Sequence, residues 1–265
     1  MKYYDYHIHS EHSFDGVVSI DKICSTAQQM GMAGLTLTEH VEFAGLYDED
    51  IMPDFPQYVL AVQAARKAYP DLQIGMGIEM GLQPDCGEKA QKICQVAEWD
   101  FIIGSSHSMH GFCLHNEEFA RGKSKDQCWH EYFLGLRQLI EKVHCFDVLG
   151  HLDLLRRGLK ADYRDISYEE YKEDIDALLL TLITLGKGIE VNTAALRYDL
   201  SELHPIKSIL CRYRQLGGEI ITCGSDAHWQ QSICRDIDKG YEYIKEAGFK
   251  YISLFEKRKL RQLPL

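Results

Sequence analysis

The sequence is short of positive charge and has no long hydrophobic run. Its 265 residues include 29 Lys and Arg against 40 Asp and Glu, which gives a net charge of −11. An acidic surface repels a phosphate backbone or an anionic bilayer, so we expect no nucleic-acid and no membrane partner. The most apolar segment, residues 178–185, is too short to span a bilayer. The first residues contain no apolar stretch of the kind found in signal peptides.

Cysteine motifs and low-complexity segments are also missing. The nine cysteines are odd in number and form no Cys-x-x-Cys pair, so neither a disulfide framework nor a zinc ribbon is indicated. Reduced thiols indicate a cytoplasmic protein. With 45% hydrophobic and 26% charged residues, the composition is that of a globular chain with a large core, which excludes the disordered and fibrous classes.

The sequence does contain a regular alternation of short apolar runs and amphipathic stretches. The expected strands are Tyr3–His9, Gly34–Thr38, Gln73–Glu79, Asp100–Ser105, Phe146–His151, Lys187–Asn192 and Glu219–Gly224. The expected helices are Ile20–Met30, Phe55–Tyr69, Gly87–Ala97, Asp126–His144, Tyr168–Leu185, Pro205–Leu216 and Cys234–Ala247. Seven strand-then-helix units predict an α/β protein with a parallel sheet, and the length suits a single β/α barrel domain over residues 1–265. Residues 248–265 are expected to add one or two strands or a terminal extension.

Residues that can bind metals follow these apolar runs. In barrels and open α/β sheets, ligands bind beyond the carboxyl ends of the strands. The first strand ends in His7 and His9, whose side chains point to the same side because they are two residues apart. Any one such residue could equally be a hydrogen-bonded core group or an exposed loop position. Six of the seven expected strands end in His, Asp or Glu, however, and the set comprises His7, His9, Glu39, His40, Glu79, His107, His151, Asp153, Asp226 and His228.

This set of side chains predicts a hydrolase site with several metal ions. Histidine and carboxylate ligands without cysteine suit Zn, Mn or Fe. The set is too large for one tetrahedral ion, so we expect two or three divalent metal ions, with a carboxylate such as Glu79 bridging two of them. Bound ions lower the pKa of water and stabilise added negative charge, which makes the hydrolysis of a phosphate ester the natural chemistry.

The same residues, in the same order, resemble the polymerase and histidinol phosphatase (PHP) family. The resemblance spans Tyr6 to His228, and residues 192–197 together with the segment after His151 resemble the monofunctional histidinol-phosphatase branch. It implies a distorted, TIM-like (β/α)7 barrel with a three-ion site at the C-terminal ends of the strands. It also implies a small phosphomonoester as substrate, namely L-histidinol phosphate, which is hydrolysed to L-histidinol and phosphate in histidine biosynthesis.

Position by position, the resemblance implies three groups of metal ligands. The first ion would be held by His7, His9, Glu79 and Asp226. The second would be held by Glu79, His107 and His151. The third would be held by His40, His228 and Asp15, with His12 as a rival to Asp15 in the loop after the first strand. The expected catalytic residues are Asp226, His228 and Glu79, and Asp226 or a nearby histidine would handle the protons.

Arginines near the strand ends are candidates for binding the phosphoryl oxygens, because the guanidinium group presents a planar fork that suits phosphate. Arg197 follows the sixth expected strand and is the first candidate. Arg156 and Arg157 follow the fifth strand and are equivalent on the sequence alone. Each could instead be a surface arginine. The candidates for binding the amine and the imidazole of the substrate, by charge and position, are Glu42, Glu117 and Glu118.

Two other functions remain open on the sequence alone. One is a PHP phosphodiesterase or phosphatase that acts on small nucleotides, which would need room for a base and a second sugar. The other is a non-catalytic, metal-binding PHP module that serves a partner structurally. A module of that kind would be expected to have lost some of its ligands, whereas the ligand set here is complete.

Overall fold

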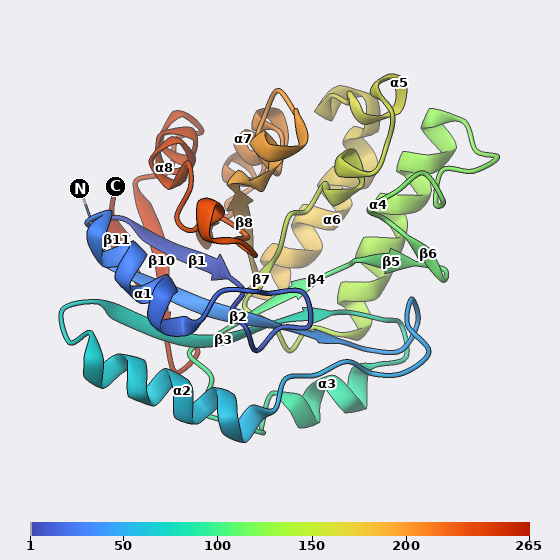
Figure 1. Cartoon of the computed structure of the whole chain (residues 1–265). Coiled ribbons are helices and arrows are strands. Elements are labelled where there is room, and N and C mark those ends of the chain that lie inside the picture. Colours follow the sequence, from blue (N-terminus) through green and yellow to red (C-terminus); the bar gives the residue numbers. More distant parts are fainter. Residues whose placement is uncertain (1) are drawn as a thin grey trace.

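Seven parallel strands form the centre of the molecule, in a computed structural model that describes residues 2–265. The strands are β1 (Tyr4–Ile8), β2 (Gly34–Glu42), β3 (Gln73–Gly81), β4 (Phe101–Ser105), β7 (Val148–Leu149), β8 (Gly188–Asn192) and β9 (Ile221–Gly224). They pair with one another in this order. An isolated parallel bridge between Ile8 and Ala227 joins the two edges, so the sheet closes into a nearly complete barrel with helices on its outside (Figure 1).

Helices connect the strands and cover the outer face of the barrel. They are α1 (Ile20–Gln29), α2 (Phe55–Ala68), α3 (Gly87–Ile93), α4 (Lys125–Lys142), α5 (Ala161–Arg164), α6 (Lys172–Thr184), α7 (Lys207–Gln215) and α8 (Ile237–Glu246). Short 3-10 helices span Leu154–Arg157, Tyr168–Tyr171, Thr193–Tyr198 and Gln230–Ser232. Within residues 2–265, no helix is both long and apolar enough to cross a membrane.

Each expected strand and helix has a counterpart, and local sequence signals explain several of the boundaries. Helix α4 begins after Ser124, which forms both hydrogen bonds of a capping box with Gln127. Gly186 follows α6 with φ of 67°, a left-handed conformation that glycine adopts without strain. Helix α7 begins at Lys207, so Pro205 precedes the helix and does not open its first turn.

The C-terminal tail forms an antiparallel hairpin that fills the N-terminal end of the barrel. Strand β10 (Tyr251–Glu256) pairs with β11 (Lys259–Pro264). The N–H of Phe255 donates to the hydroxyl of Tyr6 at 2.9 Å. The ring of Phe101 lies 5.1 Å from each of the rings of Tyr6 and Phe255, centroid to centroid. This aromatic plug (Tyr6, Phe101 and Phe255) closes the N-terminal end of the barrel.

A small hairpin and a short helix have no counterpart among the expected elements. Strands β5 (Ser108–Met109) and β6 (Phe112–Cys113) pair antiparallel in the segment after β4, and helix α5 has four residues. Strands of two residues carry no alternating pattern, and a single helical turn carries no amphipathic one. The sequence therefore gives no periodic signal for either element.

We predict that Phe101→Ala lowers the free energy of unfolding by about 3–5 kcal/mol, because it removes a fully buried ring from the aromatic plug. Denaturant unfolding followed by circular dichroism measures this change. Phe112→Ala is the matched control, since that ring is 47% exposed, and its effect should stay within about 0.5 kcal/mol. Equal effects of the two substitutions would contradict the role of the plug.

Candidate active site

Four side chains converge at the C-terminal end of the barrel. His7 lies in β1, His9 follows it, Glu79 lies in β3, and Asp226 follows β9. The Nε2 atoms of His7 and His9 lie 3.2 and 3.4 Å from Glu79 Oε2, and both lie 3.7 Å from Asp226 Oδ1. Ligand atoms that sit about 2.0–2.2 Å from one ion are separated by distances of this size. The structure therefore brings together all four members of the first expected ligand group.

Three of these atoms are buried and lack hydrogen-bond partners, as is expected of metal ligands. Among residues 2–265, the Nε2 atoms of His7 and His9 and the Oε2 atom of Glu79 are buried without a hydrogen-bond partner. One such atom costs about 1–3 kcal/mol, so three adjacent ones need compensation. Imidazole nitrogen and carboxylate oxygen are ligands that zinc, manganese and iron accept. These donors therefore fit a divalent ion.

A second group of side chains shares Glu79 with the first. The other carboxylate oxygen, Oε1, lies 3.2 Å from Nε2 of His107 and 2.9 Å from Nε2 of His151. Ser105 donates a hydrogen bond to the same oxygen at 2.6 Å and so fixes the carboxylate. Each oxygen of one carboxylate thus faces a different set of imidazoles. A carboxylate placed in this way can bridge two metal ions.

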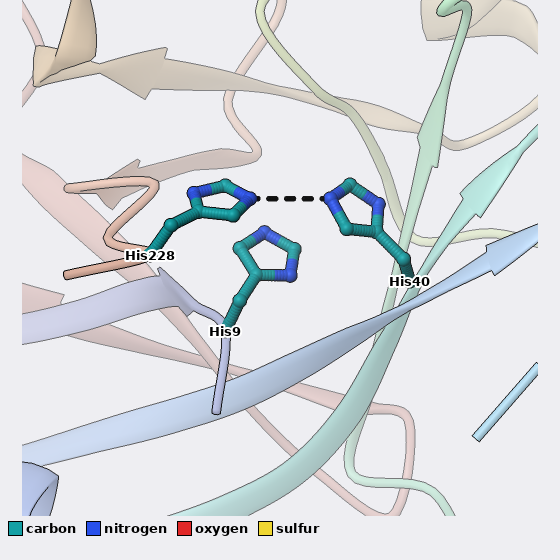
Figure 2. Close-up of side chains that lie close together, drawn as sticks. All are labelled: His9, His40 and His228. Carbon is teal, nitrogen blue, oxygen red and sulfur yellow. Dashed lines mark hydrogen bonds between the residues drawn. The ribbon is translucent and has the colours of Figure 1, made fainter. Parts of the chain in front are cut away.

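A third group lies in the wall of a cavity at this end of the barrel. The Nε2 atoms of His40 and His228 are 3.3 Å apart, and Asp15 Oδ2 lies 3.5 and 3.3 Å from them. Figure 2 shows the rings of His9, His40 and His228 gathered together. The His9 ring stacks on both of the others with centroids 4.1 Å apart. This stack places the third group directly beside the first.

The loop after β1 is held in place by Glu39, which does not join any of the three groups. The buried carboxylate of Glu39 accepts hydrogen bonds from the N–H and the hydroxyl of Ser10, at 3.0 and 2.6 Å, and from the hydroxyl of Ser13, at 2.8 Å. A Cβ at Gly16 would lie 1.9 Å from the Ser10 carbonyl oxygen, so only glycine fits there. Glu39 therefore anchors the loop that carries Asp15.

The structure distinguishes between the two rival ligands of this loop. Asp15 lines the cavity and reaches His40 and His228. The ring of His12 lies 5.5 Å from the ring of Tyr58 instead, and His12 is not part of the cavity wall. The geometry therefore favours Asp15 as the third member of the third group.

Two further carboxylates, Glu190 and Glu42, support the histidines from behind. Glu190 in β8 lies 2.6 Å from Nδ1 of His7, and Glu42 in β2 lies 2.7 Å from Nδ1 of His107. A proton held on Nδ1 leaves the Nε2 lone pair free for a metal ion. Glu42 is a substrate-binding candidate on the sequence alone, and it lines the cavity, but its bond to His107 also gives it this supporting role. For Glu190, the only sequence signal is its place near the end of the sixth strand.

The charges of the site depend on this clustering. Burial alone would raise the pKa of Glu79, but His7, His107 and His40 lower it well below its ordinary value, so the carboxylate is ionised. Burial alone would lower the pKa of His7, but Glu190 and Glu79 raise it well above its ordinary value. A metal ion that binds His7 must therefore displace a proton, and its affinity falls as the pH falls.

A cavity of about 760 Å³ opens beside the three groups. Its lining distinguishes among the three candidate arginines. Arg157 and Arg197 line the cavity, whereas Arg156 does not. Arg156 is buried, and its Nη1 bonds to Asp153 at 3.3 Å and to a main-chain carbonyl at 3.1 Å. In a 3-10 helix, neighbouring side chains point about 120° apart. The 3-10 helix that ends at Arg157 therefore turns Arg156 into the core, which corrects its expected place among the substrate-binding residues.

Other parts of the cavity wall come from loops and from the end of a 3-10 helix. His115 and Trp229 line the cavity, and so do the rings of Phe14, Tyr47 and Tyr198. The acidic candidates Glu117 and Glu118 are exposed and line a separate hollow of about 460 Å³. Loop residues follow no periodic pattern, so the sequence alone could not sort them into those that reach the cavity and those that do not.

The two cavity-lining arginines are anchored next to the first group. Arg197 Nη2 donates to the carbonyl oxygens of Ser225 and Asp226 at 2.7 and 2.9 Å. Arg157 Nη2 lies 2.9 Å from Asp226 Oδ2. Within residues 2–265, Nη1 of Arg197 has no hydrogen-bond partner, and the bonds of Arg157 involve only Nε and Nη2. Both guanidinium groups therefore keep a nitrogen without a protein acceptor, and the one on Arg197 is itself buried.

The backbone conformation of Asp226 explains how this residue contacts both the histidines of the first group and Arg197. Its φ of 53° lies in the left-handed region, which non-glycine residues occupy at a cost of about 1–3 kcal/mol. Its N–H donates to the carbonyl oxygen of His7 at 2.7 Å, which fixes the conformation. The residue thereby presents its side chain to His7 and His9 and its carbonyl oxygen to Arg197.

Comparison with known families and structures agrees with the fold and the site. A family model described as "PHP domain" matches residues 5–194, which is more than half of the chain. The chain therefore belongs to the PHP domain family, as the sequence resemblance indicates. Asp226 and His228 lie beyond the matched residues, but the barrel brings them to the same site.

Similar proteins include several phosphatases. The histidinol-phosphatase of Lactococcus lactis is 27% identical over 264 residues, which cover 98% of this chain and 97% of the relative. A Thermotoga maritima protein named "Probable histidinol-phosphatase" is 28% identical over 256 residues, 96% of each chain. A crystal structure of the Lactococcus lactis histidinol phosphate phosphatase, complexed with zinc, L-histidinol and phosphate, has a TM-score of 0.89 at 26% identity and covers 98% of this chain and 99% of that one. A structure from Listeria monocytogenes shares the fold, with a TM-score of 0.73 at 20% identity over 89% of this chain and 99% of that one.

We predict that Glu190→Gln weakens metal binding at the first group by about 10- to 100-fold, because a neutral amide no longer fixes His7 with its Nε2 lone pair free. Titration of the metal-free protein with zinc in competition with a coloured chelator measures the affinity. Glu219→Gln, at an exposed position before β9, is the matched control and should bind zinc normally. Normal zinc affinity in a folded Glu190→Gln variant would contradict the supporting role of Glu190.

Proposed function

We propose that this chain is a cytoplasmic, metal-dependent phosphomonoesterase that hydrolyses L-histidinol phosphate to L-histidinol and phosphate, as a step of histidine biosynthesis. The observation that carries the proposal is the meeting, at one end of the barrel, of three imidazole–carboxylate groups and two arginines that line the cavity. The likeness to the Lactococcus lactis enzyme, whose crystal structure contains L-histidinol and phosphate, supports the choice of substrate.

Two or three divalent ions would be held by these groups. Zinc, manganese and iron accept such ligands, and zinc is the metal in the Lactococcus lactis structure. The proposed ligands are His7, His9, Glu79 and Asp226 for the first ion, Glu79, His107 and His151 for the second, and Asp15, His40 and His228 for the third. Divalent ions in such a site supply hydroxide at neutral pH and stabilise negative charge on phosphoryl oxygens.

Arg197 and Arg157 would bind the phosphate of the substrate. Each has one guanidinium edge fixed by protein acceptors and a second nitrogen left for another partner. A guanidinium held in this way loses little freedom when an oxyanion binds, and charge-assisted hydrogen bonds are the stronger kind. The two arginines therefore orient the phosphorus atom for in-line attack.

Asp226 is the group we propose for moving the proton. Burial would raise its pKa, but Arg157 and His7 lower it well below its ordinary value, so the side chain is ionised and would readily release any proton that it accepts. It would take a proton from the attacking water and return it to the leaving alkoxide. His228 lies beside this carboxylate, with its Nδ1 3.6 Å from Asp226 Oδ1.

The proposed function is tested by the release of phosphate from the purified, manganese-supplemented protein. L-histidinol phosphate is compared with other phosphomonoesters and with short dinucleotides. A preference of about a thousandfold, roughly 4 kcal/mol of differential transition-state binding, is the expected result. Equal slow rates on all monoesters would contradict the assignment of L-histidinol phosphate as the substrate. Cleavage of dinucleotides alone would indicate a phosphodiesterase, and metal binding without turnover would indicate a structural module.

We predict that Glu79→Gln abolishes phosphatase activity and at the same time lowers the metal content, because one carboxylate serves two groups of ligands. Metal analysis of the purified variant by mass spectrometry, alongside the phosphate-release assay, measures both effects. Full metal content and activity in the variant would rule out the bridging role.

We predict that Arg197→Ala weakens phosphomonoester binding and leaves the metals in place. The loss should be about 1.5–3 kcal/mol, roughly 10- to 100-fold in kcat/KM, as expected for a hydrogen bond to a charged group. Steady-state kinetics and metal analysis provide the measurement, with Arg121→Ala, at an exposed position outside the cavity, as the control. Loss of metal from Arg197→Ala would show that Arg197 has a structural role instead.

A further inference from the structure

Asp153 and His204 form a buried pair that the proposed chemistry does not use. Asp153 is the last residue of the Gly150–Asp153 motif and His204 precedes α7, and both side chains are completely buried. Neither residue lines the cavity. The sequence places Asp153 among the strand-end residues that can bind metals, but its side chain is buried outside the cavity.

The hydrogen bonds of this pair fix the protons on the imidazole of His204. Its Nδ1 lies 2.5 Å from Asp153 Oδ1, and the other oxygen of Asp153 accepts from the N–H of Ile206 at 3.0 Å. Its Nε2 lies 3.1 Å from Nε of Arg157. An arginine can only donate, so Nε2 must be the acceptor and Nδ1 must carry the proton. Both ring nitrogens of His204 are therefore used, one toward the carboxylate and one toward the arginine.

This chain of hydrogen bonds ends at the cavity. Arg157 donates through Nη2 to the side-chain oxygen of Asn192 at 3.0 Å, and the same nitrogen lies 2.9 Å from Asp226 Oδ2. The guanidinium also lies over the ring of Tyr198, 4.9 Å from its centroid. Because the guanidinium is planar, bonds at Nε and Nη2 fix the direction of Nη1. Among residues 2–265, no hydrogen-bond partner is found for that third nitrogen.

The side chain of His204 is not needed to hold its own segment in place. The main chain already does so, because the N–H of Asn192 donates to the His204 carbonyl oxygen at 2.8 Å and the N–H of His204 donates back at 3.2 Å. The loop after β7 is tied to the same segment by the bond from Ile206 to Asp153. The imidazole adds two contacts that the backbone does not supply, one to Asp153 and one to Arg157, and only the second reaches a residue of the cavity wall.

We propose that His204, held by Asp153, is a positioning residue that orients Arg157 so that its free Nη1 faces the phosphate of the substrate. The proposal rests on the proposed phosphatase function and names a second layer of that site. It also explains why His151 and Asp153 occur two residues apart in one motif. His151 would bind metal, and Asp153 would orient Arg157 through His204. A flexible arginine would have to be ordered each time a phosphate bound, whereas this one is ordered in advance.

Two substitutions of His204 separate the two halves of its role. His204→Asn keeps a donor near the position of Nδ1 for Asp153 and removes the acceptor for Arg157. His204→Gln keeps an acceptor near the position of Nε2 and removes the donor. We expect His204→Asn to weaken binding of inorganic phosphate to the zinc-loaded protein, and to raise KM for L-histidinol phosphate, by about tenfold or more, with a smaller change in kcat. His204→Gln should retain most of the affinity.

Calorimetric titration with inorganic phosphate gives the affinity without requiring turnover. The matched control is His130→Asn, because His130 also pairs with an aspartate, Asp174, but lies on the surface of α4. It should bind phosphate as the parent protein does. Metal analysis of every variant shows whether an effect comes from lost metal instead of a misdirected arginine.

A double-mutant cycle distinguishes positioning from a general structural effect. If His204 acts through Arg157, then His204→Asn should weaken phosphate binding no further in an Arg157→Ala background. Multiplied losses in the double variant, or equal losses in His204→Asn and His204→Gln, would overturn the proposal.

A conservative substitution of Arg157 keeps the test independent of whether His204→Asn folds. Arg157→Lys retains the positive charge and lacks the Nε–H that His204 binds. It should also lose about tenfold or more in phosphate affinity, and parental affinity would overturn the proposal. If the parent protein binds phosphate but hydrolyses no phosphomonoester, the proposed function fails while the phosphate comparison still tests the positioning. If the zinc-loaded parent protein binds no phosphate, the positioning role of His204 fails, and the release of phosphate from L-histidinol phosphate still decides the proposed function.

Discussion

The site depends on one buried carboxylate. The five imidazole nitrogens that lie within 2.9–3.4 Å of the two oxygens of Glu79 belong to His7, His9, His40, His107 and His151. A buried charge is tolerated only where other groups compensate it. Glu79 therefore requires this cluster, either through protons on the imidazoles or through metal ions that replace them. The parallel order of β1, β2, β3, β4 and β7 places the ends of these strands next to one another and makes the cluster possible.

The barrel divides into an apolar half and a polar half, and a local irregularity lets one strand serve both. The pairing of β1 with β2 shifts its register between Asp5 and Ile8. Tyr6 can therefore pack in the aromatic plug while the next residue, His7, faces Glu79. Regular alternation would have sent these neighbours to opposite faces of the sheet. Irregularities of this kind re-aim side chains beside functional sites.

The parts that could be predicted from the sequence are those that depend on periodicity and topology. Apolar runs mark the strands, and parallel strands bring their carboxyl ends together, so the ligand groups follow. The difference between Arg156 and Arg157 could not be predicted, because it depends on the turn of a short 3-10 helix. The roles of Glu190 and His204 depend on partners 183 and 47 residues away, respectively, and no local pattern encodes such pairs.

The net charge of −11 and the proposed phosphate dianion are compatible because charges act over a limited range. At physiological ionic strength, exposed charges more than about 8 Å apart are largely screened. Arg157 and Arg197 lie beside the proposed binding position and are mostly shielded from water, so their attraction is screened far less. A nucleic acid must bring many phosphates near the acidic surface at once, whereas a phosphomonoester brings one to a local cluster of cations. The acidic surface therefore opposes a polyanion much more than it opposes a single phosphate, and it attracts the cationic end of L-histidinol phosphate.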